Sequence, residues 1–139
     1  MSGAVKFSAR GPRHLNLPFE PESVRVARHE LEKWLDGWSP REGFADDCRL
    51  VVSELVGNAV RHAHPLDDGT MAVDWERLGD AFCIRVSDGG SRTRPHLVEA
   101  GHSDLGGRGM VIIDALASDW WVEADDDRTT VHALLPVAV

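Results

Sequence analysis

Apolar side chains recur at three- and four-residue intervals over two stretches in the first half of the chain. ESVRVARHELEKWL, residues 22–35, carries one such stripe, and residues 44–63 carry a longer one. This spacing places the apolar side chains on one face of an α-helix, so both stretches are predicted to be amphipathic helices. Ser23 is expected to cap the first helix, and Gly37 and Pro40 are expected to end it.

Short apolar runs with strand-like alternation fill much of the remaining chain. HLNLPF (14–19) suits a short strand, and TMAVDWERL and AFCIRVSD suit two strands joined by a hairpin near Gly79–Asp80. A helix is predicted at GRGMVIIDALA, followed by strands at DWWVEA and TTVHALLPV, with one of Trp120 and Trp121 facing the core. This order predicts an α+β fold in two layers, with helices on one face of a mixed, mostly antiparallel sheet.

Composition and charge narrow the class of protein. A chain of 139 residues is most simply one domain, and its formal charge of −8 argues against broad nucleic-acid binding, which needs clustered cations. Cys48 and Cys83 lack metal-binding spacing and are expected to be buried free thiols in a reducing compartment. The chain shows no signal-peptide core and no run of about 18 apolar residues. We therefore expect a cytoplasmic protein without membrane contact.

A line of polar side chains interrupts the apolar pattern of the longer predicted helix. Glu54, Asn58 and His62 recur at intervals of four residues, so they share one helix face. A solvated helix face would explain this stripe, yet its neighbours between 51 and 60 are nearly all apolar. The alternative is a site in which the amide oxygen of Asn58 binds Mg²⁺ and the carboxylate of Glu54 accepts a proton.

Two glycine-containing segments add candidate chemistry. VSDGG (86–90) ends a predicted strand and is either a tight turn or a place where Asp88 accepts a hydrogen bond from a base amino group. GGRGM (106–110) opens a helix, where free amides and the helix dipole attract phosphate. A dinucleotide-binding fingerprint is excluded here, because no strand precedes these glycines and Ile112 stands where Gly or Ala is required.

The order of these motifs resembles that of the Bergerat-fold, or histidine kinase-like, ATPases. A helix with Glu-x-x-x-Asn comes first, then a strand ending in Asp-x-Gly, a long loop, and Gly-x-Gly at a helix start. ELVGNAVRH is most similar to the Glu-x-x-x-Asn-Ala-x-x-His helix of the anti-sigma-factor serine/threonine kinases. The resemblance covers about residues 14–136. It implies an N-terminal extension at 1–13 and an ATP-binding domain at 14–139, with a lid at about 89–107.

The resemblance also implies roles for individual residues. Glu54 would be the catalytic base, and Asn58 would hold Mg²⁺. His62 would complete the helix motif, Asp88 would accept from the adenine amino group, and Gly90 would lie beside the ring.

The remaining implied nucleotide contacts lie in the lid, at the next helix start and in the last strand: Arg92, Gly107, Arg108, Gly109, Met110 and Thr130. The glycines would offer backbone amides to the phosphates, and Thr130 would lie near the adenine. Arg92 departs from the family pattern, because it stands where Asp-x-Gly-x-Gly has its second glycine.

The implied function is an ATP- and Mg²⁺-dependent anti-sigma factor of a partner-switching system. It would sequester a sigma factor and phosphorylate a STAS-type anti-anti-sigma protein on serine, without direct nucleic-acid contact. The family also allows a homodimer. Two alternatives remain open from the sequence: a non-catalytic binding module of the same fold, and a stand-alone catalytic fragment of a two-component histidine kinase.

Overall fold

The computed structural model describes residues 11–90 and 108–138. The elements along this part of the chain are β1 (Arg13–Pro18), α2 (Ser23–Leu35), α3 (Phe44–His62), β2 (Thr70–Leu78), β3 (Ala81–Asp88), α4 (Arg108–Leu116), β4 (Asp119–Ala124) and β5 (Thr129–Pro136). Most of the predicted N-terminal extension and of the predicted lid lies outside the described residues.

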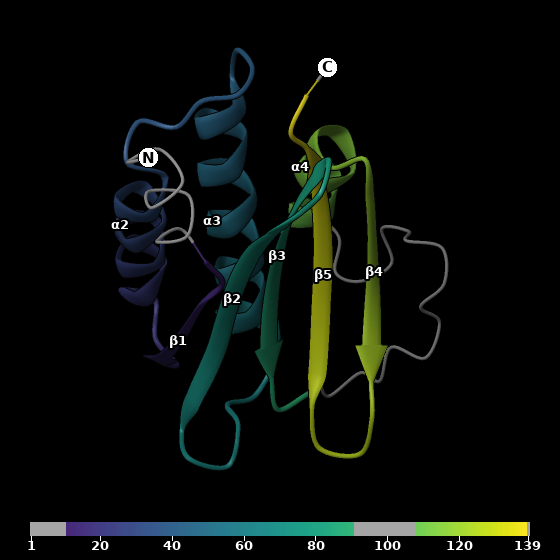
Figure 1. Ribbon diagram of the computed structural model, residues 1–139. Helices are drawn as coiled ribbons and strands as arrows, with labels where there is room; N and C mark the ends of the chain where they lie inside the picture. Colours follow the sequence, from purple (N-terminus) through teal and green to yellow (C-terminus); the bar gives the residue numbers. More distant parts are fainter. Residues whose placement is uncertain (1–10, 91–107, 139) are drawn as a thin grey trace.

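The described strands form one sheet in the order β1-β2-β3-β5-β4, and each neighbouring pair is antiparallel. Figure 1 shows α2, α3 and α4 on the far side of this sheet, so the predicted two-layer α+β fold with helices on one face is confirmed. The predicted hairpin is also confirmed, because only Gly79–Asp80 separates β2 from β3. Gly79 has a φ of 63°, a left-handed conformation that glycine adopts without strain.

The two N-terminal helices follow the predicted apolar spacing, and α3 ends within one residue of its predicted bound. α2 ends where Asp36 takes a left-handed conformation with a φ of 46°. The predicted capping role of Ser23 is wrong, because Ser23 is already the first helical residue and its side chain makes no capping bond. Its hydroxyl instead donates to the carbonyl of Pro18 at 2.7 Å, which ties the start of α2 to the end of β1.

The core lies between the helices and the sheet. Phe44 of α3 and Phe82 of β3 are fully buried and pack edge to face, with 5.7 Å between ring centroids. Cys48 and Cys83 are free and buried, as predicted. Burial raises the pKa of the Cys48 thiol to about 12, so this group stays protonated and unreactive at neutral pH.

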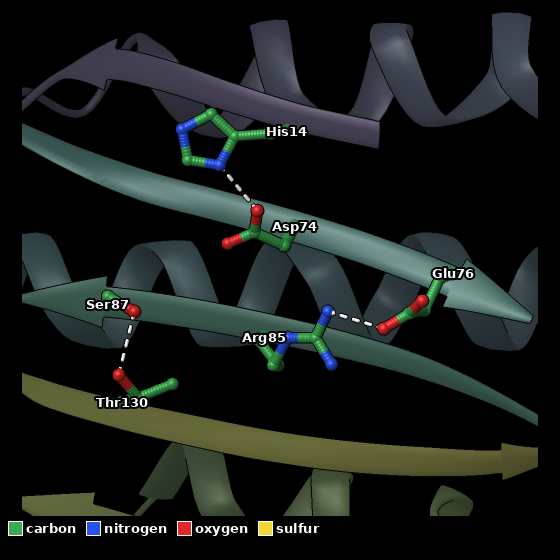
Figure 2. A network of polar contacts seen from close by, with 6 residues as sticks. All are labelled: His14, Asp74, Glu76, Arg85, Ser87 and Thr130. Carbon is green, nitrogen blue, oxygen red and sulfur yellow. Dashed lines mark hydrogen bonds and ion pairs between the residues drawn. The ribbon is translucent and has the colours of Figure 1, made fainter. Parts of the chain in front are cut away.

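The side of the sheet that faces away from the helices is polar. Figure 2 views this open face, on which His14 pairs with Asp74, Arg85 pairs with Glu76 at 2.9 Å, and Ser87 bonds to Thr130 at 2.8 Å. Because side chains alternate along a strand, these pairs identify which residues of β2, β3 and β5 point away from the helices.

The two tryptophans of β4 divide as predicted. Trp120 is 7% exposed and donates from its indole nitrogen to Asp114 of α4 at 3.0 Å. Trp121 is 37% exposed and stacks on His132, with 4.7 Å between ring centroids. Within the described residues, no helix has the length and apolar character needed to cross a membrane.

Candidate functional site

A cavity of about 80 Å³ lies between α3, the start of α4 and the sheet. Its polar lining comes from separate elements: Asn58 and His62 of α3, Asp88 at the end of β3, and Thr129 at the start of β5. Its remaining walls are mainly apolar: Leu55, Ala59, Ala63, Val86, Met110, Val122 and Val131. A few polar groups in a mostly apolar hollow are typical of a site for a flat, partly polar ligand.

The polar stripe of α3 faces this cavity over only part of its length. Asn58 and His62 line it, whereas Glu54 lies one helical turn earlier on the same face and is half-buried. The Asn58 amide is held from both sides: its nitrogen donates to Met110 Sδ at 3.5 Å, and its oxygen accepts from Arg61 Nη2 at 3.1 Å. The first of these contacts links α3 to α4.

Asp88 supplies the buried carboxylate of the site. It is 6% exposed, and its Oδ1 accepts from the Gly90 amide at 2.8 Å. Burial raises the pKa of this carboxyl to about 6, against a smaller opposing effect of the Gly90 amide. Among the described residues, no donor bonds to its Oδ2, so one oxygen of Asp88 remains available to a ligand's N–H group.

Backbone hydrogen bonds hold the turn after Asp88 against the segment that follows α3. The Gly89 amide donates to the His64 carbonyl at 2.8 Å, and the His64 amide donates to the Gly90 carbonyl at 2.9 Å. A Cβ on Gly89 would lie 2.1 Å from the Pro65 carbonyl oxygen, so only glycine fits this approach. This clamp sets the position of Asp88 relative to α3.

The sequence prediction missed this clamp. It interpreted the glycines after Asp88 as room for a ring to approach, with Gly90 beside that ring, and did not anticipate that Gly89 lies against the backbone of Pro65. Gly90 has a φ of 102°, which favours glycine as well, and its carbonyl and amide are both used in the turn.

The predicted placement of Thr130 in the site is wrong. Thr130 lies on the open face of the sheet, where its hydroxyl bonds to Ser87 (Figure 2). Thr129 lies opposite Asp88 in the strand register and lines the cavity instead. The two threonines are adjacent, and strand alternation sends neighbouring side chains to opposite faces. The threonine that lines the cavity is therefore Thr129.

Only part of the predicted phosphate-binding segment lies among the residues that the structure describes. α4 begins at Arg108, as the Gly-x-Gly segment predicted, and Met110 is buried against the cavity. Gly109 is the second residue of α4. Arg92 and Gly107 lie outside the described residues.

Comparisons with known proteins identify the family. A family model described as a histidine kinase-like ATPase domain matches residues 17–134. Serine-protein kinase RsbW of Listeria monocytogenes serotype 4a (strain HCC23) is 34% identical over 133 residues, with 84% of this chain and 82% of the relative covered. The chain belongs to the RsbW serine-protein kinase family of histidine kinase-like ATPase domains.

A second relative agrees with this membership in the RsbW family. RsbW of Bacillus cereus (strain AH187) is 26% identical over 132 residues, with 84% of this chain and 80% of the relative covered. Two solved structures share the fold. One holds the RsbU and RsbW domains of Rv1364c from Mycobacterium tuberculosis, with a TM-score of 0.68, 24% identity, and 90% of this chain and 32% of that chain covered. The other is the SiaB–SiaC complex from Pseudomonas aeruginosa, with a TM-score of 0.70, 14% identity, and 96% and 95% covered.

These findings confirm the predicted family and its ATP-binding kinase class. The two alternatives, a non-catalytic module and a histidine kinase fragment, are not favoured, because the curated relatives named above are serine-protein kinases.

The side chains of this RsbW-family site offer few metal ligands, which fits a metal ion held mainly by the phosphates of a nucleotide. The described residues contain no cluster of three or more His, Cys, Asp or Glu side chains that could hold a metal ion by themselves. Asn58 offers one hard amide oxygen at the cavity. Mg²⁺ is commonly held by one or two protein oxygens together with phosphates and water, so the site fits this ion.

Proposed function

We propose that this chain is an ATP-dependent serine kinase and anti-sigma factor of a partner-switching system, acting in the cytoplasm. The observation that carries the proposal is the meeting of Asn58 and Asp88, from a helix and a strand, around one largely apolar cavity. An adenine ring needs apolar walls and one acceptor for its amino group, and this cavity offers both. The ATP-binding domain would span residues 14–139, with its lid at about 89–107.

Polar groups of the cavity and of the neighbouring start of α4 would then bind the nucleotide. Oδ2 of Asp88 would accept from the adenine amino group, and Thr129 would contact the ring edge from β5. The first amides of α4, with those of Gly107 and Gly109, would receive the phosphates, because a helix N-terminus attracts anions. Arg92 and Arg108 would add positive charge near the phosphates.

The transfer step would use Glu54 and Asn58. Asn58 Oδ1 would hold a Mg²⁺ ion, which when bound offsets negative charge on the phosphates. Glu54 would accept the proton of the substrate serine hydroxyl. The serine oxygen would bond to the γ-phosphorus as the bond from that phosphorus to ADP breaks, leaving phosphoserine, ADP and a protonated Glu54.

Two protein partners follow from this proposal. One is a sigma factor, which the kinase would sequester, and the other is a STAS-type anti-anti-sigma protein, which it would phosphorylate on serine. The proposal is also compatible with a homodimer. Phosphorylation on serine is supported by the RsbW relatives, which are named serine-protein kinases.

Calorimetric titration of ATP with Mg²⁺ tests the proposal first. The wild type is expected to bind, and Asn58→Ala and Asp88→Ala are each expected to weaken binding at least tenfold. Asp74→Ala serves as the matched control, because Asp74 lies on the open face of the sheet and pairs with His14 (Figure 2). No binding by the wild type, or equal loss in the control, contradicts the proposed site.

Phosphotransfer to a purified anti-anti-sigma protein tests the catalytic step. Glu54→Gln is expected to keep ATP affinity and to lose transfer, because glutamine cannot accept the serine proton. Transfer by Glu54→Gln at the wild-type rate would rule out Glu54 as the base.

A further inference from the structure

Arg61 forms a hydrogen bond to Asn58 Oδ1, the oxygen that would bind Mg²⁺ in the proposed function. Its Nη2 donates to Asn58 Oδ1 at 3.1 Å, from one helical turn further along α3. Asn58 Nδ2 is turned the other way, toward Met110 Sδ. The oxygen that would coordinate Mg²⁺ is therefore bonded to a cation of the same helix.

The helix is shaped to accept this guanidinium. Gly57 lies four residues before Arg61, on the same face of α3. A Cβ at Gly57 would lie 3.1 Å from Arg61 Nη1, so the missing side chain leaves the room in which the guanidinium lies. The position of Arg61 in the last turn of α3 is also favourable, because a helix C-terminus attracts positive charge.

The contact between Arg61 and Asn58 can break without leaving a buried charge unpaired. Arg61 is exposed, so its guanidinium can pass to water. A Mg²⁺ ion coordinated by Asn58 Oδ1 would lie close to a guanidinium that is 3.1 Å from the same oxygen, and the like charges of the two cations repel.

We propose that Arg61 is a positioning residue that caps the metal-binding oxygen of Asn58 in the free protein and must release it before Mg²⁺ binds with the nucleotide. This inference rests on the proposed function, since it concerns the same site. Arg61 thereby raises the Mg²⁺ concentration that the site requires, and it holds the Asn58 amide in one orientation until the ion arrives.

The test compares Arg61→Met with the wild type. Methionine retains an unbranched stem of similar length but has no donor and no charge. ATP binding is measured by calorimetry across a Mg²⁺ series at one total ATP concentration, so that complex formation in solution is the same for both proteins. Arg61→Met is expected to reach half-maximal enhancement of binding at about threefold to tenfold lower Mg²⁺, the range set by one net hydrogen bond.

Loss of positive charge alone could mimic this result, so a matched control is needed. Arg28→Met removes a guanidinium from α2 that donates to Ser53 Oγ on α3, at 3.3 Å, and not to Asn58. The titrations are also repeated at 0.5 M salt, where the screening length is about 4 Å and distant charges have little effect. The lower Mg²⁺ midpoint should persist at this salt in Arg61→Met and be absent in Arg28→Met.

A second readout needs no nucleotide. The side-chain amide resonance of Asn58 is assigned by its disappearance in Asn58→Ala, and it should shift strongly in Arg61→Met and little in Arg28→Met. An unchanged resonance in Arg61→Met overturns the capping contact.

The outcomes separate the inference from the proposed function. A wild type that binds no nucleotide refutes the proposed function and this inference with it. A wild type that binds nucleotide, with an equal or higher Mg²⁺ midpoint in Arg61→Met, overturns the inference alone. A higher midpoint is the result expected if Arg61 helps to hold the phosphates instead.

Discussion

Replacing Asp88 by asparagine should stabilise the protein while removing its ATP binding. Burial raises the pKa of Asp88 from its ordinary value of 3.8 to about 6. The folded protein therefore holds this proton more tightly than the unfolded chain does. At a pH well above 6, folding must bury an ionised carboxylate, and the cost is the pKa difference of about 2 units, or about 3 kcal/mol at 1.36 kcal/mol per unit.

The sign of the pH dependence follows from the same pKa. Below pH 3.8 both states are protonated, and Asp88 carries no ionisation cost. Between about pH 4 and 6 the unfolded state loses its proton first, so the stability contributed by Asp88 falls as pH rises. Asparagine cannot ionise, so it avoids this loss of stability. Burial of its NH₂ group without a hydrogen-bond acceptor offsets part of that stabilisation. Asp88→Asn should thus gain about 1–3 kcal/mol at pH 8 and little or nothing at pH 4.

Urea unfolding of wild type and variant between pH 4 and 8 measures this difference directly. Asp68→Asn is a control of opposite sign, because hydrogen bonds from Thr70 lower the pKa of that exposed carboxyl. Its stability contribution is present at neutral pH and is lost as pH falls, so Asp68→Asn should lose stability at pH 8 and not at low pH. A difference between Asp88→Asn and wild type that does not vary with pH would refute the reasoning.

Two further predictions concern the geometry around the cavity. Gly89→Ala should cost about 2–5 kcal/mol in unfolding free energy, because its Cβ would meet the Pro65 carbonyl at 2.1 Å and strain two backbone hydrogen bonds. Gly79→Ala, with open space around its Cβ, should cost only about 1–2 kcal/mol, and equal losses by urea titration would contradict the clamp. Thr129→Val should weaken ATP binding, whereas Thr130→Val should leave the ATP affinity within about twofold of the wild type. Calorimetry measures both affinities, and the reverse pattern would show that Thr130 is the threonine that contacts ATP.

The fold was largely predictable because its elements follow simple periodicities. The apolar stripe of α3 gave bounds that agree with the structure to within one residue. The hairpin at Gly79–Asp80 and the division of Trp120 from Trp121 followed from turn chemistry and strand alternation. Ser23 was misjudged because a serine near a helix start can cap the helix or bond elsewhere, and only the position of Pro18 decides between the two.

Site residues could be predicted only where a sequence motif specifies their spacing and the element on which they lie. Asn58 and Asp88 each belong to a spaced pattern, and the structure brings them to one cavity. Strand register decides whether Thr129 or Thr130 faces the cavity, and the sequence of two adjacent threonines does not indicate that register. The contact of Arg61 with Asn58 depends on side-chain orientation, on which the sequence pattern is silent.

The clamp at Gly89 explains how a helix and a strand can hold one ligand in register. Asn58 is positioned by α3, and Asp88 by β3, and these elements are far apart in sequence. The segment directly after α3 binds the turn directly after β3 through both hydrogen bonds of His64. Any shift of that segment would therefore move Asp88, the proposed acceptor for the adenine, relative to Asn58, the proposed metal ligand. Gly89 is thus as much a part of the site as the side chains that line it.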